Sequence, residues 1–88
     1  MSKEVIIVKL DADGEQTQYI YENSFSIAEN LVNAVIMEYF GIKNWWSDVY
    51  NRKASEIKQQ MVKSSNFYIW ADKDKKITFV ARKKSRRI

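Results

Sequence analysis

Apolar and polar residues alternate on both sides of an Asp-Gly dipeptide near the start of the chain. Asp13 and Gly14 fit the centre of a type I′ turn, in which both central residues have positive φ. Ala12 then faces Glu15, and side chains of the flanking strands alternate between two faces. One face is apolar and collects Ile6, Val8, Leu10, Tyr19 and Tyr21. The pattern therefore predicts a hairpin over residues 4–22.

Two helices are predicted in the middle of the chain. Ser26 and Glu29 form a capping box ahead of an apolar run, and Gly41 suits the position just after a helix. The helix over 27–40 has a wide apolar stripe, which is typical of a buried helix. The second helix, over 45–63, begins at Asn44 or Ser47 as its cap and is amphipathic.

A second hairpin is predicted near the end, with strands at 67–71 and 77–82 around the turn DKDKK. We expect Ile69 to face Phe79. This register places one set of side chains on the core side: Phe67, Ile69, Ala71, Ile77, Phe79 and Ala81. It places the other set on the opposite side: Tyr68, Trp70, Thr78, Val80 and Arg82.

These elements give an α+β fold with the order β-β-α-α-β-β. We expect an antiparallel sheet, four-stranded where the two hairpins meet, with both helices packed on one face. Residues 1–82 form a single domain in this interpretation, and residues 83–88 follow as a basic C-terminal tail.

Composition excludes several kinds of chemistry. The 88 residues include no cysteine and no histidine, so disulfides, thiolate chemistry and histidine triads are absent. No apolar run approaches the roughly 18 residues of a membrane span. The two glycines cannot form a glycine-rich phosphate loop. We therefore expect a cytoplasmic, non-enzymatic protein with no catalytic residue, metal site, cofactor or membrane partner.

The stretch DADG at 11–14 has two functional alternatives. A calcium EF-hand loop requires glycine at position 6, but counting from Asp11 places Gly14 at position 4. The segment IIVKLDADG, 6–14, resembles the LAGLIDADG homing-endonuclease signature in its last four residues. That family has small residues where this chain has Ile7 and Val8. A plain hairpin turn is the interpretation that we favour.

Charge is divided unevenly along the chain. Residues 1–41 carry two lysines against seven acids, a net −5, and residues 42–88 carry 13 basic residues against four acids, a net +9. Such asymmetry is typical of a protein that binds nucleic acid or an acidic protein surface. The candidate phosphate contacts lie at the end of the chain: Arg82, Lys83, Lys84, Arg86 and Arg87. Tyr68 and Trp70 are the candidate residues for stacking on bases.

Sequence reasoning thus favours a small nucleic-acid-binding protein, for RNA or another single strand. The alternative is a protein-binding inhibitor or adaptor that covers an acidic surface or a nucleic-acid-processing enzyme, such as a nuclease, through a basic and aromatic face. In its general composition the chain is similar to small early proteins of bacterial viruses, and this resemblance implies inhibition of a host enzyme or a defence factor. A homodimer formed through the open sheet face is a third interpretation.

Overall fold

The computed structural model describes residues 2–22, 26–44, 47–72, 74 and 76–87. Its elements run in the order β1 Ser2–Ala12, β2 Glu15–Tyr21, α1 Ile27–Ala34, η1 Val35–Tyr39, α2 Asp48–Gln60, β3 Val62–Ser64, β4 Phe67–Asp72 and β5 Ile77–Arg87. The α+β class, the antiparallel sheet and the two helices are confirmed. The sheet has five strands instead of four, in the order β2-β1-β5-β4-β3, because Val62–Ser64 pairs with the start of β4.

The first hairpin has the predicted register. Ala12 pairs with Glu15, and the pairing continues without interruption to Ile6 and Tyr21. Asp13 has φ 52° and Gly14 has φ 83°, as a type I′ turn requires. The stretch DADG is therefore a turn between two strands. Among the described residues no group of three or more Asp and Glu side chains could hold a metal ion.

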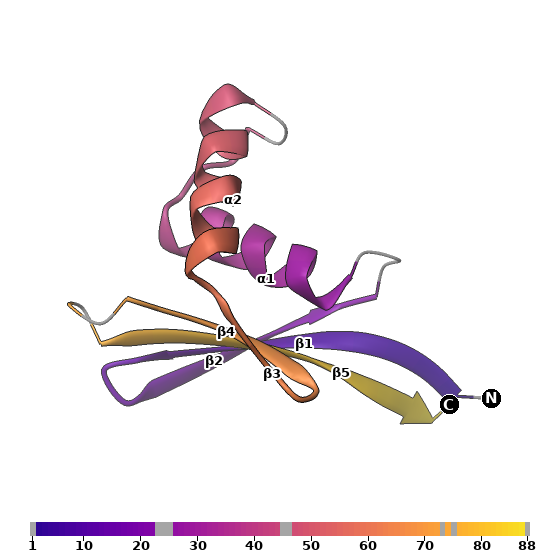
Figure 1. Ribbon diagram of the computed structural model, residues 1–88. Helices are drawn as coiled ribbons and strands as arrows, with labels where there is room; N and C mark the ends of the chain where they lie inside the picture. Colours follow the sequence, from indigo (N-terminus) through magenta and orange to yellow (C-terminus); the bar gives the residue numbers. More distant parts are fainter. Residues whose placement is uncertain (1, 23–25, 45–46, 73, 75, 88) are drawn as a thin grey trace.

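The centre of the sheet is formed by β1 and β5, which lie side by side along their whole lengths (Figure 1). The pairing runs from Ala12 with Ile77 to Ser2 with Arg87. This finding corrects the expectation that a tail begins at residue 83, because β5 continues through Arg87. The start of β1 supplies backbone donors and acceptors to these residues, and a paired backbone is favoured over an unpaired one.

The second hairpin has a register one residue away from the predicted one. Ile69 pairs with Val80, and Trp70 pairs with Phe79. Because strand side chains alternate, this shift exchanges the two faces of β4. Trp70 now faces the helices together with Phe79, and Ile69 faces the uncovered side. The structure thereby buries an indole in place of a smaller aliphatic side chain, which removes more apolar surface from water.

The core lies between the sheet and α1. Ser26 caps α1, and its Oγ accepts a hydrogen bond from the Glu29 N–H at 3.2 Å, as the capping box predicted. The predicted helix over 27–40 is α1 followed by the π-helical turn η1. The most deeply buried large side chains of this core are Val8, Leu31, Val35, Ile36, Ile57 and Phe79.

The two helices lie on the same side of the sheet but pack against different parts of the molecule. α1 lies over the strands, whereas α2 rises away from them (Figure 1). α2 packs on α1 through Tyr50 and Ile57, and the Tyr50 Oη donates to Asn33 Oδ1 at 3.1 Å. Ser47 caps α2 as predicted, but the helix ends at Gln60 because residues 62–64 enter the sheet. No helix in the described part of the chain is long and apolar enough to span a membrane.

Candidate nucleic-acid interface at the basic end of the sheet

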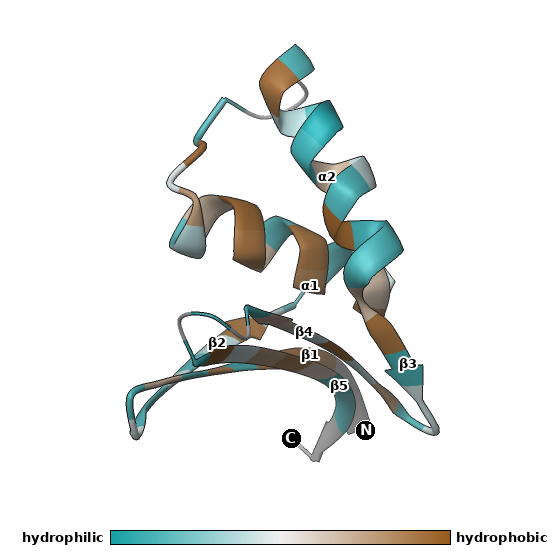
Figure 2. Ribbon diagram, turned by 60° about the vertical axis from the view of Figure 1, so that its left-hand side comes forward, coloured by the Kyte–Doolittle hydropathy of each residue, from teal (hydrophilic) through white to brown (hydrophobic). Residues whose placement is uncertain are grey.

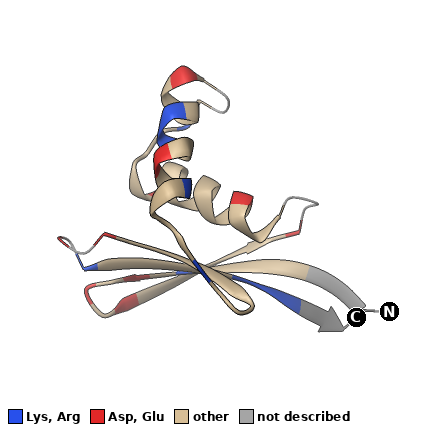
Figure 3. Ribbon diagram, in the orientation of Figure 1, with Lys and Arg blue, Asp and Glu red and all other residues tan. Residues whose placement is uncertain are grey.

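The charge asymmetry of the sequence becomes a separation in space. Arg82, Lys83 and Lys84 are exposed on β5, where they pair with Ile7, Ile6 and Val5 of β1. This end of the sheet, where both chain ends lie, is called the basic end here (Figure 3). Arg86 and Arg87 extend it through backbone pairing with Lys3 and Ser2, and their side chains lie outside the described residues.

The opposite end of β1 is acidic. Asp11, Asp13 and Glu15 surround the turn between β1 and β2 (Figure 3). Several strand residues separate this turn from the basic end, a spacing longer than the Debye length of about 8 Å at physiological salt. The attraction between the two ends is therefore screened.

No described element covers the sheet face away from the helices (Figure 2). The ends of the sheet bend away from the helices, so this face is concave (Figure 2). By alternation it presents Val5 and Ile7, which are only 3% and 5% exposed although they lie outside the helix-side core. The neighbouring strands thus shield an apolar centre on this open face.

A hollow of about 410 Å³ lies on the open face. Its lining combines cationic, polar and apolar side chains: Lys9, Asp11, Gln16, Phe67, Thr78, Val80 and Arg82. Asp11 would repel a phosphate at one end of the hollow, whereas Lys9 and Arg82 would attract one. An anionic ligand is therefore favoured toward the basic end.

A second hollow, of about 470 Å³, lies beside the start of β4. It is lined by Ile27, Lys63, Ser65, Asn66, Phe67, Tyr68 and Lys83. The Lys63 Nζ lies 5.9 Å from the centroid of the Tyr68 ring. Phe67 lines both hollows, and each hollow also contains cationic side chains.

Of the two aromatic residues predicted to stack on bases, Tyr68 lines the second hollow. Trp70 is 4% exposed, and its Nε1 donates to Gln60 Oε1 at 3.0 Å. Its ring packs 5.4 Å from Tyr39 and 6.1 Å from Phe79, measured between centroids. The prediction that Tyr68 and Trp70 stand on the open face is wrong, because the shifted register turns both toward the helix side. Trp70 is in the core, and Tyr68 is half-buried against it.

Sequence reasoning missed Phe67, Lys63 and Lys9 as residues of this region. Phe67 was assigned to the core by the predicted register, and it exchanged faces with Trp70. The signal that could have found it is the alternative pairing of Trp70 with Phe79, which places two large aromatic rings together on the buried side.

Three tyrosines with raised pKa values pack against the core and support the fold. The Tyr39 Oη donates to Asp72 Oδ2 at 2.5 Å, and this hydrogen bond raises the pKa of Tyr39 to about 12. Burial, followed by the nearby Glu38 carboxylate, raises the pKa values of Tyr19 and Tyr21. All three side chains therefore stay neutral at physiological pH, and they tie β2 and β4 to the helical layer.

Comparison of the chain with protein-family models, curated proteins and solved structures finds no match.

Proposed function

We propose that this protein is a non-enzymatic binder of single-stranded nucleic acid, with RNA as the favoured ligand. The observation that carries the proposal is the position of Phe67, which lines two hollows that also contain Lys9, Arg82, Lys63 and Lys83. Aromatic rings among cations suit a strand whose bases are unpaired, because each base offers a face for stacking and each phosphate a charge.

The proposed contacts are of two kinds, charged contacts to phosphates and aromatic stacking on bases. Arg82, Lys83 and Lys84 would contact phosphates, and each contact releases counterions. Phe67 would stack on a base at the open face, whereas Tyr68 lines the second hollow from the opposite side of β4. Arg86 and Arg87 continue β5 at the basic end and would lengthen the phosphate-binding track. Stacking and charge together explain why exposed cations gather beside a half-buried ring.

A single strand is favoured over a duplex by the need for accessible base faces and by the lack of a strongly basic helix face on α2. A duplex hides its base faces, so a ring such as Phe67 would have nothing to stack on. Helix α2 is not a basic reading helix, because its Lys53 pairs with Glu56 at 3.3 Å and also lies 4.4 Å from the centroid of the Phe40 ring.

Fluorescence anisotropy with labelled single-stranded RNA, single-stranded DNA and duplex tests the proposal. Phe67→Ala should weaken single-strand binding by about 5- to 150-fold, the equivalent of one lost stacking contact of roughly 1–3 kcal/mol. Phe40→Ala is the matched control, since it removes a ring that is 36% exposed directly after η1. Equal losses in both variants would contradict the proposal.

The salt dependence of binding tests the phosphate contacts separately. Arg82→Ala should reduce the slope of log K against log salt by about 0.7, the value for one phosphate contact on a single strand. The double variant Arg86→Ala, Arg87→Ala should reduce it further. Arg52→Ala, on α2, is the control and should leave the slope unchanged. An unchanged slope in the β5 variants would show that these residues do not contact phosphate.

Ile20 and Val62 favour a second candidate function, that of a protein-binding inhibitor or adaptor. They are 45% and 60% exposed and flank the open face on its two edge strands. Exposed apolar residues around a basic surface suit an acidic partner such as a nucleic-acid-processing enzyme. A pull-down with and without nuclease separates the two: a bound protein that survives nuclease and high salt supports this candidate, and salt-sensitive nucleic acid supports the first.

A further inference from the structure

The two edges of the sheet differ in a way that points to a partner. One edge is β3, which has three residues and includes Lys63. The other edge is β2, which has seven residues, Glu15–Tyr21. A strand edge presents unpaired backbone donors and acceptors, and proteins protect long edges with lysine, proline or a bulge.

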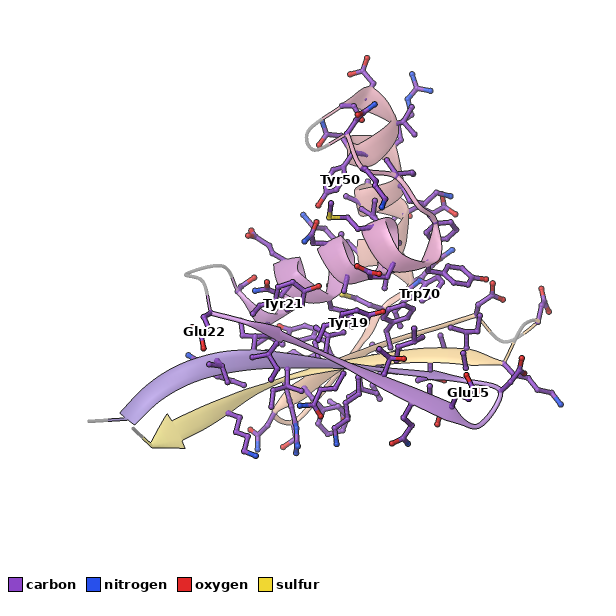
Figure 4. All side chains as sticks on the ribbon, turned by 180° about the vertical axis from the view of Figure 1, so that it is seen from behind. Glu15, Tyr19, Tyr21, Glu22, Tyr50 and Trp70 are labelled. Atoms are coloured by element: carbon purple, nitrogen blue, oxygen red, sulfur yellow. The ribbon has the colours of Figure 1, made fainter. Side chains whose placement is uncertain are left out.

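β2 has none of these protections. Its sequence, EQTQYIY, contains no lysine, arginine or proline, and its pairing with β1 is continuous and has no bulge. Seen from behind, β2 lies at the front of the sheet with no other element before it (Figure 4). Within the described residues, no strand pairs with the outer side of β2.

The register of the first hairpin decides which backbone groups are unpaired. In a two-residue hairpin the closing pair, here Ala12 and Glu15, exchanges both hydrogen bonds, and alternate pairs do the same along the ribbon. The residues between them on β2 direct their N–H and C=O groups outward. They are Gln16, Gln18 and Ile20.

We propose that β2 pairs with β2 of a second copy of this chain, antiparallel, about a two-fold axis at Gln18. Gln18 then faces Gln18 of the second copy, and Gln16 faces its Ile20. These three outward residues are therefore mutually complementary, and all of their outward donors and acceptors are satisfied. A two-fold axis of this kind uses the same patch on both copies, as in most homodimers.

The side chains also fit this register. Ile20, which is 45% exposed, gains Gln16 and Gln18 of the second copy as neighbours. Glu15 lies opposite Tyr21, so no charge on β2 faces a like charge, an arrangement that would destabilise the pair.

Charges beyond β2 act in both directions. The acidic β1–β2 turn of each copy lies beside the basic end of the other, where Lys83 and Lys84 attract it. Glu22 of the second copy is nearer, opposite Gly14, and repels the turn. The electrostatic contribution is therefore small, and the backbone hydrogen bonds carry the pairing.

This axis is perpendicular to the sheet and keeps the helices of both copies on the same side. The two concave open faces consequently join into one continuous surface, with a basic end at each extreme. The inference does not rest on nucleic-acid binding, because it depends only on the β2 edge.

Sedimentation equilibrium of the full chain over a range of concentrations tests the inference. We expect a mass that rises toward twice the 10.4 kDa of one chain. Gln18→Lys and Gln18→Glu each place two like charges opposite one another and should weaken dimerisation about fivefold. An equimolar mixture of the two variants pairs opposite charges and should recover the dimer.

Three outcomes would overturn the proposal. The wild-type chain could stay at 10.4 kDa at every concentration. Both Gln18 variants could dimerise as the wild type does, which would place the interface elsewhere, for example on the open face. The mixture could behave as the separate variants do. Gln16→Lys, which faces Ile20, is the matched control for added charge on β2 and should weaken the dimer less than Gln18→Lys.

Discussion

The register of the second hairpin can be tested by comparing two neighbouring residues of β4. Trp70→Ala removes a side chain that is 4% exposed, contacts three aromatic rings and donates to Gln60. Truncating a buried aromatic residue to alanine costs about 3–5 kcal/mol. Ile69→Ala removes a half-buried side chain from the open face and should cost only about 1–2 kcal/mol, because part of it is already in water.

The size of this difference matters for so short a chain. At about 0.05–0.15 kcal/mol per residue, the whole fold is stabilised by roughly 4–13 kcal/mol. Trp70→Ala should therefore remove a large share of the free energy of unfolding, and Ile69→Ala a small share. Urea unfolding followed by far-UV circular dichroism measures both without depending on tryptophan fluorescence.

The opposite ranking would refute the reasoning. In the register expected from sequence, Ile69 is in the core and Trp70 is on the open face, so Ile69→Ala would be the more damaging change. Should Trp70→Ala fail to fold, Trp70→Phe and Ile69→Val give the same comparison with smaller losses. Trp70→Phe should then be the more destabilising of the two, because it removes both volume and the indole N–H.

Three further outcomes follow from local geometry. Tyr39→Phe removes the hydrogen bond to Asp72. The pKa of Tyr39 in the folded protein, about 12, lies above the ordinary value of 10.0. The bond therefore stabilises the protein below about pH 10, and this stabilisation is lost as the pH rises toward 12. Urea unfolding should show the wild-type advantage over Tyr39→Phe shrinking across that range, and a constant difference would contradict it. Gly41→Ala should lower the free energy of unfolding by about 1 kcal/mol through backbone strain, because Gly41 has φ 69° and the space for a Cβ is empty. Gly41→Asn should lower it by less, and equal losses in the two variants would argue against backbone strain. Ser26→Ala should cost about 1 kcal/mol through loss of the α1 cap, as thermal unfolding would show, whereas Ser55→Ala on the exposed side of α2 should cost less.

The parts of the fold that sequence predicts correctly are those with a local cause. Asp13-Gly14 allows one turn type, and that turn fixes every pair of the first hairpin. The turn at DKDKK has no such dipeptide. Both faces of β4 carry apolar or aromatic residues, Phe67 and Ile69 on one side and Tyr68 and Trp70 on the other, so alternation alone cannot choose between them.

The basic end could likewise be predicted only in part from the sequence. Arg82, Lys83 and Lys84 were predicted as surface cations, and they are exposed on β5. That the strand continues beyond them could not be predicted, because its partner is the start of β1, far away in the sequence. The aromatic residue beside the cations is Phe67 instead of Trp70, and its identity depends on the tertiary choice of register.

The pairing of β1 with β5 also determines the order in which the protein can fold. The two strands at the centre of the sheet come from opposite ends of the chain, since Ser2 pairs with Arg87. Their contact closes the longest loop that this chain can form, and such contacts slow folding. During synthesis, β1 and β2 can form their hairpin early, but the other edge of β1 stays unpaired until β5 is available. Until β5 is synthesised, the apolar strand β1 lacks one of its two neighbours, so the nascent chain can pair there with other chains.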